Sequence, residues 1–271
     1  YSILRPGFDA FWNMEVVPVL DAGFKPPLVE GFSMYLQSAP VQEVIRQVTA
    51  SELRRIDEDG TETPPPLSER IRAVQAYVSS GPPHDSRQLD MPLAEMEDAL
   101  LAESFPMPEK PLTPISWDEL PPRVLLPHYR EVVAQQRGEL AGIRMDELHS
   151  GARSPQNLLG RMFGSPPPVD ADPQETRMLL GSILGPVLSA ILHMRGVKLE
   201  CRPGEPVRAL CEPVPVQPFT LFDDIHAGRL KIEEWQQVCK KYQLQERDLG
   251  ELCAEFLAGE SGEVSGKENL S

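Results

Sequence analysis

The five histidines are the first residues to consider, because zinc-dependent hydrolysis commonly relies on this side chain. A compact zinc site places two histidines four residues apart on one helical face, with a glutamate beside them as general base. No histidine of this chain has a second one four residues away. We therefore interpret each of them as an exposed or hydrogen-bonded side chain, and we predict no metal ligand and no catalytic residue in this chain. The five are His84, His128, His149, His193 and His226.

Motifs for nucleophilic catalysis and phosphate binding are also missing from the sequence. No serine lies in a GxSxG turn, and Gly181, Gly185 and Gly204 fit neither a Walker loop nor a dinucleotide-binding fingerprint. The cysteines form no CxxC pair, and in a chain of this length we interpret them as reduced, buried thiols, which favours a cytosolic location. The cysteines are Cys201, Cys211, Cys239 and Cys253.

The charge balance excludes the most common polyanionic partners. The chain has 271 residues with 26 Lys and Arg against 41 Asp and Glu, which gives a formal net charge of -15. Such a surface repels a phosphate backbone or an anionic bilayer on average. The sequence contains only isolated basic pairs, such as Arg54-Arg55 and Lys240-Lys241, and no basic tract. We therefore predict that nucleic acid is not a partner.

The elements that must position any functional residue are predicted to be helices. The 29 prolines fall mostly between apolar segments, which indicates short helices joined by proline-stiffened connections. A first helix is predicted from Asp9, as its N-cap, to Ala22, with a kink or break at Pro18 and a stop at Gly23. Further apolar stripes predict helices that begin near Pro26-Pro27, Pro40, Leu67 and Met91.

The second half of the chain predicts one long helix, a hairpin and shorter helices. Asp172 and Pro173 are typical of a helix start, with Glu175 as the partner in a capping box, and the helix extends to about Arg195. Alternating residues around Pro203-Gly204 predict a small β-hairpin near residues 197–211. Helices are expected at 115–141, in short pieces at 145–169, at 218–227, and around Trp235 and Leu252.

Residues 178–194 carry no formal charge and could cross a membrane only at the lower limit of length. Gly181, Gly185 and Ser189 form a row of small residues that would allow close helix packing in lipid. Ser182, Pro186 and His193 are unfavourable there, and a buried core helix of a soluble domain explains the same pattern. We favour the core helix and keep the membrane-inserted alternative open.

The fold class predicted from these elements is mainly α, with short proline-bounded helices in two helical domains. Residues 1–84 form the first domain, and residues 85–114 form a linker with a short helix. Residues 115–258 form a second, accessory and mostly helical domain. The polar residues 259–271 are expected to be a disordered tail.

Two stretches resemble the end of a known catalytic domain. Residues 11–32 read FWNMEVVPVLDAGFKPPLVEGF and residues 63–71 read TPPPLSERI. In this order and at this separation they are similar to the end of the catalytic domain of membrane zinc metalloendopeptidases, the family of the prenyl-protein proteases and HtpX-type heat-shock proteases. Arg70 matches the arginine of the closing motif and is a candidate for bordering the peptide groove. Pro64 replaces that motif's histidine.

The resemblance implies that residues 1–84 are the helical end of a metallopeptidase-like catalytic domain. In that family the HExxH helix and a glutamate ligand precede the first stretch, so this chain, which opens at Tyr1, would be a C-terminal portion. The implied cofactor is zinc in the parent enzyme, and the implied partners are the upstream catalytic region and a peptide or protein substrate. This chain alone is expected to be inactive and to bind no zinc.

The same resemblance places this portion, as a soluble part, on the cytoplasmic side of a membrane-anchored parent protein, through which membrane contact would occur. A second hypothesis does not depend on the resemblance. Because the residues alone form no complete reaction centre, the chain can equally be a non-catalytic helical scaffold or protein-interaction module. Trp117 and Trp235 would then be candidates for partner surfaces.

Overall fold

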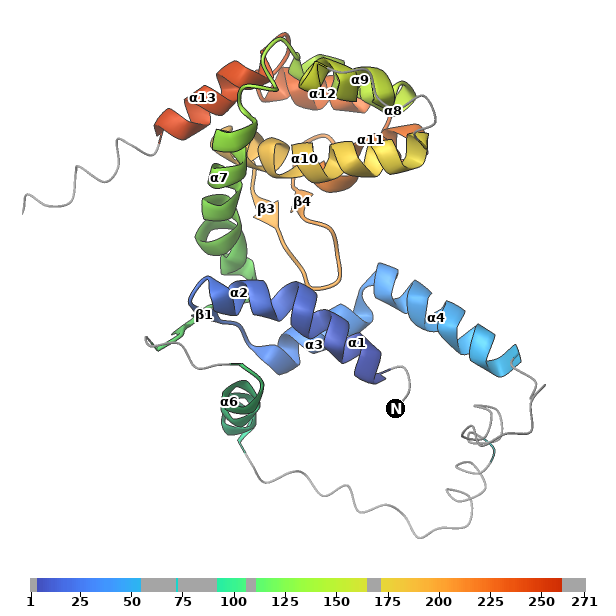
Figure 1. Ribbon diagram of the computed structural model, residues 1–271, viewed down its shortest axis with the longest axis vertical. Helices are drawn as coiled ribbons and strands as arrows, with labels where there is room; N and C mark the ends of the chain where they lie inside the picture. Colours follow the sequence, from blue (N-terminus) through green and yellow to red (C-terminus); the bar gives the residue numbers. More distant parts are fainter. Residues whose placement is uncertain (1–3, 55–71, 73–91, 106–110, 165–171, 260–271) are drawn as a thin grey trace, which may run out of the picture. The chain divides into compact units, whose positions relative to one another are not determined.

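The structure is a computed structural model that describes residues 4–54, 72, 92–105, 111–164 and 172–259. Most of these residues are helical, and the strands among them are only two residues long, so the fold is mainly α with a small hairpin as predicted (Figure 1). The chain divides into two compact units. Unit 1 comprises residues 1–116 with 203–205, and unit 2 comprises residues 117–202 and 206–271.

Unit 1 begins with a helix that is longer than predicted. Helix α1 (Leu4–Phe11) continues through a π-helical turn, η1 (Trp12–Val16), into α2 (Val17–Asp21). Asp9 therefore lies inside α1, and the prediction that it caps the helix was wrong, because the helix begins one turn earlier. The irregularity predicted at Pro18 is present as the π-helical turn directly before α2, and Pro18 is the second residue of α2.

The remaining elements of unit 1 begin at a tight turn. Gly23 has a φ of +85°, which a residue without Cβ adopts freely. Strand β1 (Phe24–Lys25) pairs in parallel with β2 (Thr113–Pro114), with Phe24 opposite Thr113. Between these strands the structure describes three helices, and the starts predicted near Pro26-Pro27, Pro40 and Met91 are confirmed. They are α3 (Leu28–Gln37), α4 (Ala39–Arg54) and α6 (Leu93–Ser104).

An aromatic cluster holds α1 against α3. The Phe8 and Phe32 rings meet edge to face with centroids 5.3 Å apart, and the centroids of Phe11 and Phe32 are 5.4 Å apart. Tyr35 lies one turn further along α3, with its ring centroid 5.6 Å from that of Phe11. Phe11 and Val16 are fully buried. Aromatic pairs with this geometry contribute beyond their buried area, so the first stretch of the resemblance, residues 11–32, is a packed part of unit 1.

Unit 2 consists of short helices around one long helix. After the 3-10 turn η2 (Trp117–Glu119) and the π-helical turn η3 (Pro121–Leu125), the chain forms α7 (Leu126–Gln136), η4 (Met145–Leu148), α8 (His149–Arg153) and α9 (Pro155–Phe163). Then follow α10 (Pro173–Met194), the antiparallel strands β3 (Leu199–Glu200) and β4 (Arg208–Ala209), and η5 (Pro218–Thr220). The last elements are α11 (Leu221–His226), α12 (Ile232–Lys241) and α13 (Leu249–Gly259).

Helix α10 is the centre of the unit 2 core. The Asp172 side chain accepts a hydrogen bond of 2.9 Å from the Gln174 N–H, so the predicted N-cap is present, although it bonds to the second helical residue and not to Glu175. Leu184, Leu188 and Ile191 are fully buried on α10. Among the described residues, α10 is the only helix that is long and apolar enough to span a membrane, and most of it is buried in unit 2.

The row of small residues on α10 has a local explanation in unit 2. A Cβ atom added at Gly181 would lie 2.1 Å from the Phe219 carbonyl oxygen, and one added at Gly185 would lie 2.5 Å from the Phe219 ring. Ser189 is fully buried and donates a hydrogen bond of 2.8 Å to the Gly185 carbonyl. The two glycines therefore make room for η5 to lie directly on α10.

Several predicted features lie outside the described residues. These are the helix expected to begin near Leu67, apart from Arg72, and the tail from residue 260 onward. The linker expected at 85–114 falls partly in this category, and its described part contains α6 and β2, both of which belong to unit 1.

Candidate functional site

The described histidines do not gather at one place. His128 and His226 are exposed on α7 and α11. The His149 Nδ1 atom lies 2.6 Å from the Asp146 carbonyl oxygen, one turn earlier in the chain. His193 is half-buried near the end of α10, and its Nδ1 atom has no hydrogen-bond partner. His84 lies outside the described residues.

The cysteines are single free thiols, as predicted. Cys211, Cys239 and Cys253 are buried in the core of unit 2, and burial raises the pKa of each thiol to about 12. A thiol with such a pKa is a poor metal ligand and a poor nucleophile, because both roles need the thiolate. Cys201, after β3, is half-buried.

The donors that zinc needs do not meet within the described part of the chain. No group of three or more His, Cys, Asp or Glu side chains there is placed to hold a metal ion. A hydrolytic zinc site requires three protein ligands around one open position. The described residues therefore do not fit zinc, and we derive no reaction step through it.

Two adjacent carboxylates of α11 have structural partners. The Asp223 Oδ1 atom accepts a hydrogen bond of 2.9 Å from the buried Arg177 guanidinium. Asp224 accepts one of 2.8 Å from the Thr220 hydroxyl and one of 2.7 Å from Arg229 Nε. Because their oxygens are engaged in these contacts between elements, we interpret both carboxylates as part of the scaffold.

The weak site candidate from the resemblance, Arg70, is not among the described residues, and neither is the closing motif at residues 63–71. The first stretch is described. Its apolar side chains Val16, Val19 and Leu20 are buried in unit 1. These three side chains therefore have a packing role. Burial raises the pKa of Glu15 in the same stretch, and its Oε1 atom accepts a hydrogen bond of 2.9 Å from the Gly204 N–H.

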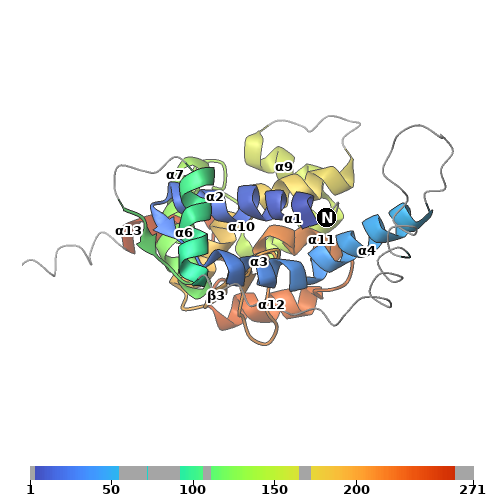
Figure 2. The same cartoon turned by 90° about the horizontal axis from the view of Figure 1, so that it is seen from below.

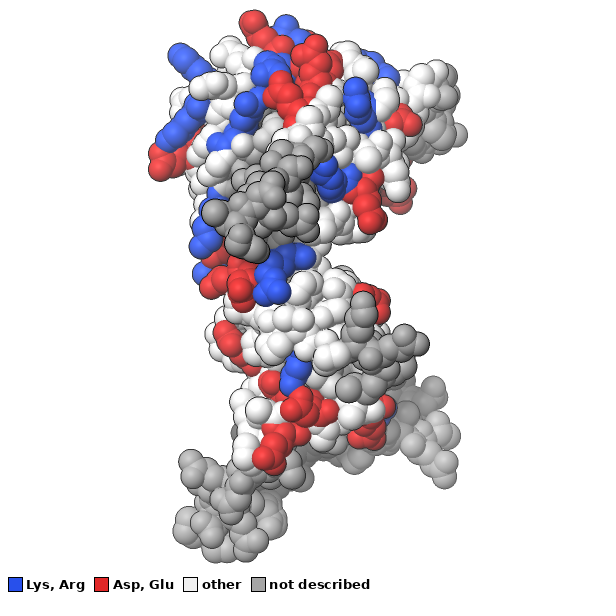
Figure 3. All heavy atoms as spheres, turned by 90° about the vertical axis from the view of Figure 1, so that its left-hand side faces the viewer, with Lys and Arg blue, Asp and Glu red and all other residues white. Residues whose placement is uncertain are grey.

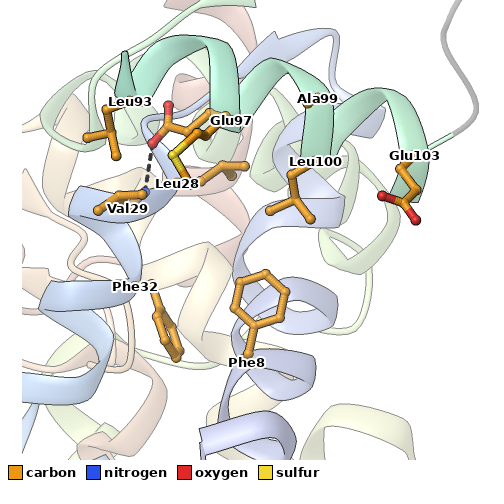
Figure 4. Close-up of a pocket in the computed structure, with 10 residues that line it drawn as sticks. Phe8, Leu28, Val29, Phe32, Leu93, Glu97, Ala99, Leu100 and Glu103 are labelled. Carbon is orange, nitrogen blue, oxygen red and sulfur yellow. Dashed lines mark hydrogen bonds between the residues drawn. The ribbon is translucent and has the colours of Figure 1, made fainter. Parts of the chain in front are cut away.

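Unit 1 has an apolar groove between α6 and the pair α1 and α3, and we call it the α6 groove. Its volume is about 490 Å³, within the range of about 300–1,000 Å³ that is usual for ligand sites. Phe8 and Phe32 form one wall, and Leu93 and Leu100 project towards them from α6 (Figure 4). In Figure 2, α6 runs transverse to α1 and α3.

Two polar contacts hold α6 in place. The Glu97 Oε1 atom accepts a hydrogen bond of 2.8 Å from the Val29 N–H at the start of α3. That N–H is one of the donors that a helix N-terminus leaves unpaired, so Glu97 stabilises α3 from a neighbouring helix. Asp98 forms an ion pair with Lys25 on β1. Both contacts join residues far apart in the sequence.

The acidic residues of α6 also give the groove its charge. Helix α6 contains Glu95, Glu97, Asp98 and Glu103 and no Lys or Arg. Glu103 lines the groove, is exposed, and makes no ion pair with the described residues. In Figure 3, acidic side chains predominate on the visible face of unit 1, whereas both signs are interspersed over unit 2.

This groove was not predicted from the sequence, because the helix expected to begin near Met91 was assigned to the linker at 85–114. The side chains expected at a partner surface, Trp117 and Trp235, are instead buried in unit 2. One available signal was the composition of α6, which combines exposed Leu93 with four carboxylates on a short helix. Comparison of the chain with protein-family models, curated proteins and solved structures gave no match.

Proposed function

We propose that this chain is the C-terminal portion of a zinc-dependent metalloendopeptidase, where it forms the helical end of the catalytic domain and an accessory domain. The observation that carries the proposal is the ordered pair of stretches at residues 11–32 and 63–71. The parent enzyme would cleave peptide bonds with water activated by zinc. Its zinc ligands would lie in polypeptide that precedes Tyr1.

The packing of the first stretch is consistent with this proposal. In α1, α2 and α3 its aromatic and aliphatic residues pack on one another, and Gly23 makes the turn between the helices. A segment whose apolar side chains are packed in this way can support a neighbouring site as a rigid wall, without supplying a reactive group. The role proposed for unit 1 is therefore to support the catalytic region and to border its substrate groove, with Arg70 as the candidate residue on that border.

The test compares this chain with the longer protein encoded by the same gene. The 271-residue chain should contain no stoichiometric zinc and should not cleave casein. The longer protein should bind zinc and cleave casein, and a chelator should abolish the cleavage. Zinc-to-protein ratios from elemental analysis and the release of casein fragments are the two measurements. A preceding coding sequence without an HExxH pair, or zinc held tightly by this chain, would overturn the proposal.

A second candidate function is a non-catalytic protein-interaction module, and the α6 groove favours it. Val29 and Leu93 border the groove with 47% and 54% of their surface exposed, which is unusual for large apolar side chains around one concave surface. The preceding coding sequence distinguishes the two candidate functions, because only the first requires a zinc-binding helix there.

A further inference from the structure

We infer that the α6 groove is a docking site for an amphipathic, basic helical segment of a partner protein. The inference rests on the second candidate function, because it names the class of partner for the same groove, and it is independent of the zinc proposal. It follows from the shape, the apolar lining and the charge of a groove that is formed within unit 1 alone.

The lining of the groove selects a peptide over a small polar ligand. Phe8, Leu28, Phe32, Met96 and Leu100 present apolar surface to the groove. Sites for small molecules usually add several polar groups that converge on the ligand. Here Glu97 and Glu103 are the polar side chains among the lining residues, and Glu97 is already bonded to the Val29 N–H. Apolar residues spaced along one helical face are what such a groove accommodates.

The charge around the groove selects a basic segment. Asp98 is neutralised by Lys25, but Glu103, which lines the groove, has no basic partner among the described residues. Lysine or arginine residues that flank the apolar anchors would pair with this carboxylate and increase the rate of encounter. A second copy of this acidic chain, or an anionic bilayer, would instead bring like charge to the groove.

The binding experiment uses the full 271-residue chain and three labelled peptides in fluorescence anisotropy. The first peptide has Leu at positions i, i+3, i+4 and i+7 and Lys at its flanks. The second replaces each Lys by Glu, and the third replaces each Leu by Ser. We expect saturable binding of the first peptide only, with an affinity that falls as salt is added. Equal binding of the first two peptides, or of the first and third, overturns the inference.

Two variants locate the binding site. Leu100→Asp places a charge among the apolar side chains and should weaken binding at least about tenfold, as truncation of a central anchor commonly does. Glu103→Lys reverses the charge at the groove and should weaken binding about threefold, which is typical of an exposed charge pair. Met14→Asp is the matched control for the first variant, because Met14 is 72% exposed in unit 1 and does not line the groove.

Glu95→Lys is the matched control for the charge reversal, since it makes the same change on the same helix away from the groove lining. It should change the affinity less than Glu103→Lys does. Circular dichroism of each variant verifies the fold. If Leu100→Asp unfolds α6, the two control peptides still test the inference, because they are measured on the unchanged chain. Binding that is unchanged by Leu100→Asp in a folded protein contradicts the inference. So does concentration-dependent self-association that Leu100→Asp abolishes, because it identifies a second copy as the occupant.

Discussion

At the scale of single residues, the two glycines of α10, Gly181 and Gly185, lie too close to Phe219 to be replaced by a larger residue without a shift. Helix α10 and the η5 turn approach so closely that no side chain fits between Gly181 and the Phe219 backbone. Because a backbone carbonyl cannot rotate away as a flexible side chain can, an added methyl group must move the whole turn. The glycines therefore serve the packing of unit 2.

We predict that Gly181→Ala lowers the free energy of unfolding by about 2 kcal/mol, which is typical of overpacking in a core. The measurement is urea unfolding followed by circular dichroism. Gly138→Ala is the matched control, because nothing lies within 4 Å of a Cβ atom added there and its φ is not positive. The control should be neutral or slightly stabilising. Equal stability of the two variants would contradict the packing seen here.

The buried thiols lead to a second prediction at this scale, about pH. Burial raises the pKa values of Cys211, Cys239 and Cys253 to about 12, from 9.0 in an exposed thiol. A folded-state pKa above the unfolded one contributes stability that is fully present below the lower value and is lost as the pH rises towards the higher one. The free energy of unfolding should therefore fall between pH 9 and 12.

The Cys239→Ala variant tests whether the buried thiols cause this loss of stability. The variant should show a shallower decrease of stability with pH than the parent chain, because one titrating group is removed. In native protein at about pH 8, a thiol reagent should modify Cys201 before the other three, since the thiolate is the reacting form. Modification of all four thiols at equal rates in folded protein would show that the three are not buried as described.

At the scale of elements, the Arg177–Asp223 pair connects α10 to α11. The Arg177 side chain is 9% exposed and the Asp223 side chain 29% exposed, so the pair is largely shielded from water. Removal of one partner from a buried pair leaves the other charge without compensation. The junction between the two helices should therefore depend on both residues.

We predict that Asp223→Ala lowers the free energy of unfolding by about 2 kcal/mol, less than for a fully buried pair because Asp223 keeps some contact with water. Thermal unfolding by calorimetry measures the effect. Lys241→Ala is the control, because Lys241 and Glu212 form an ion pair that is largely exposed, and its loss should leave the unfolding temperature unchanged. An equal decrease of the unfolding temperature in both variants would show that the shielded pair stabilises the protein no more than the exposed pair does.

Most of these helices were predicted from the sequence, because the residues that start or stop a helix lie next to it in the chain. Asp172 and Pro173 marked the start of α10, and Gly228, with a φ of +72°, follows the end of α11 as expected. Asp9 was misleading, since a good capping residue also occurs inside a helix. The α6 groove could not be predicted, because it depends on contacts such as Val29 with Glu97, which helical periodicity does not specify.

At the scale of the whole molecule, the charge is the property that every partner meets. The formal net charge of -15 extends over both units, and the basic residues of unit 2 are interspersed with acidic ones on the face shown in Figure 3. A protein that binds nucleic acid non-specifically needs a contiguous basic surface to release counterions. No such surface is visible on that face.

We therefore predict that the chain does not bind duplex DNA or single-stranded RNA, even at low salt, where non-specific binding is strongest. The measurement is an electrophoretic mobility shift with a labelled duplex and a labelled RNA oligomer at about 50 mM salt. A basic protein of similar size serves as the positive control. A salt-sensitive shift produced by this chain would show that charge averaged over the molecule is a poor guide to its partners.

The short parallel pairing of β1 with β2 has a consequence for how this chain can change in length. It holds Lys25 beside Pro114, so the part of unit 1 that carries α3, α4 and α6 begins and ends at neighbouring points. The entropy lost when a flexible connection is closed grows only logarithmically, by about 0.6 kcal/mol for each doubling of its length. Insertions or deletions between these two strands, outside the helices, should therefore be inexpensive, and this region is a favourable place to introduce a reporter sequence.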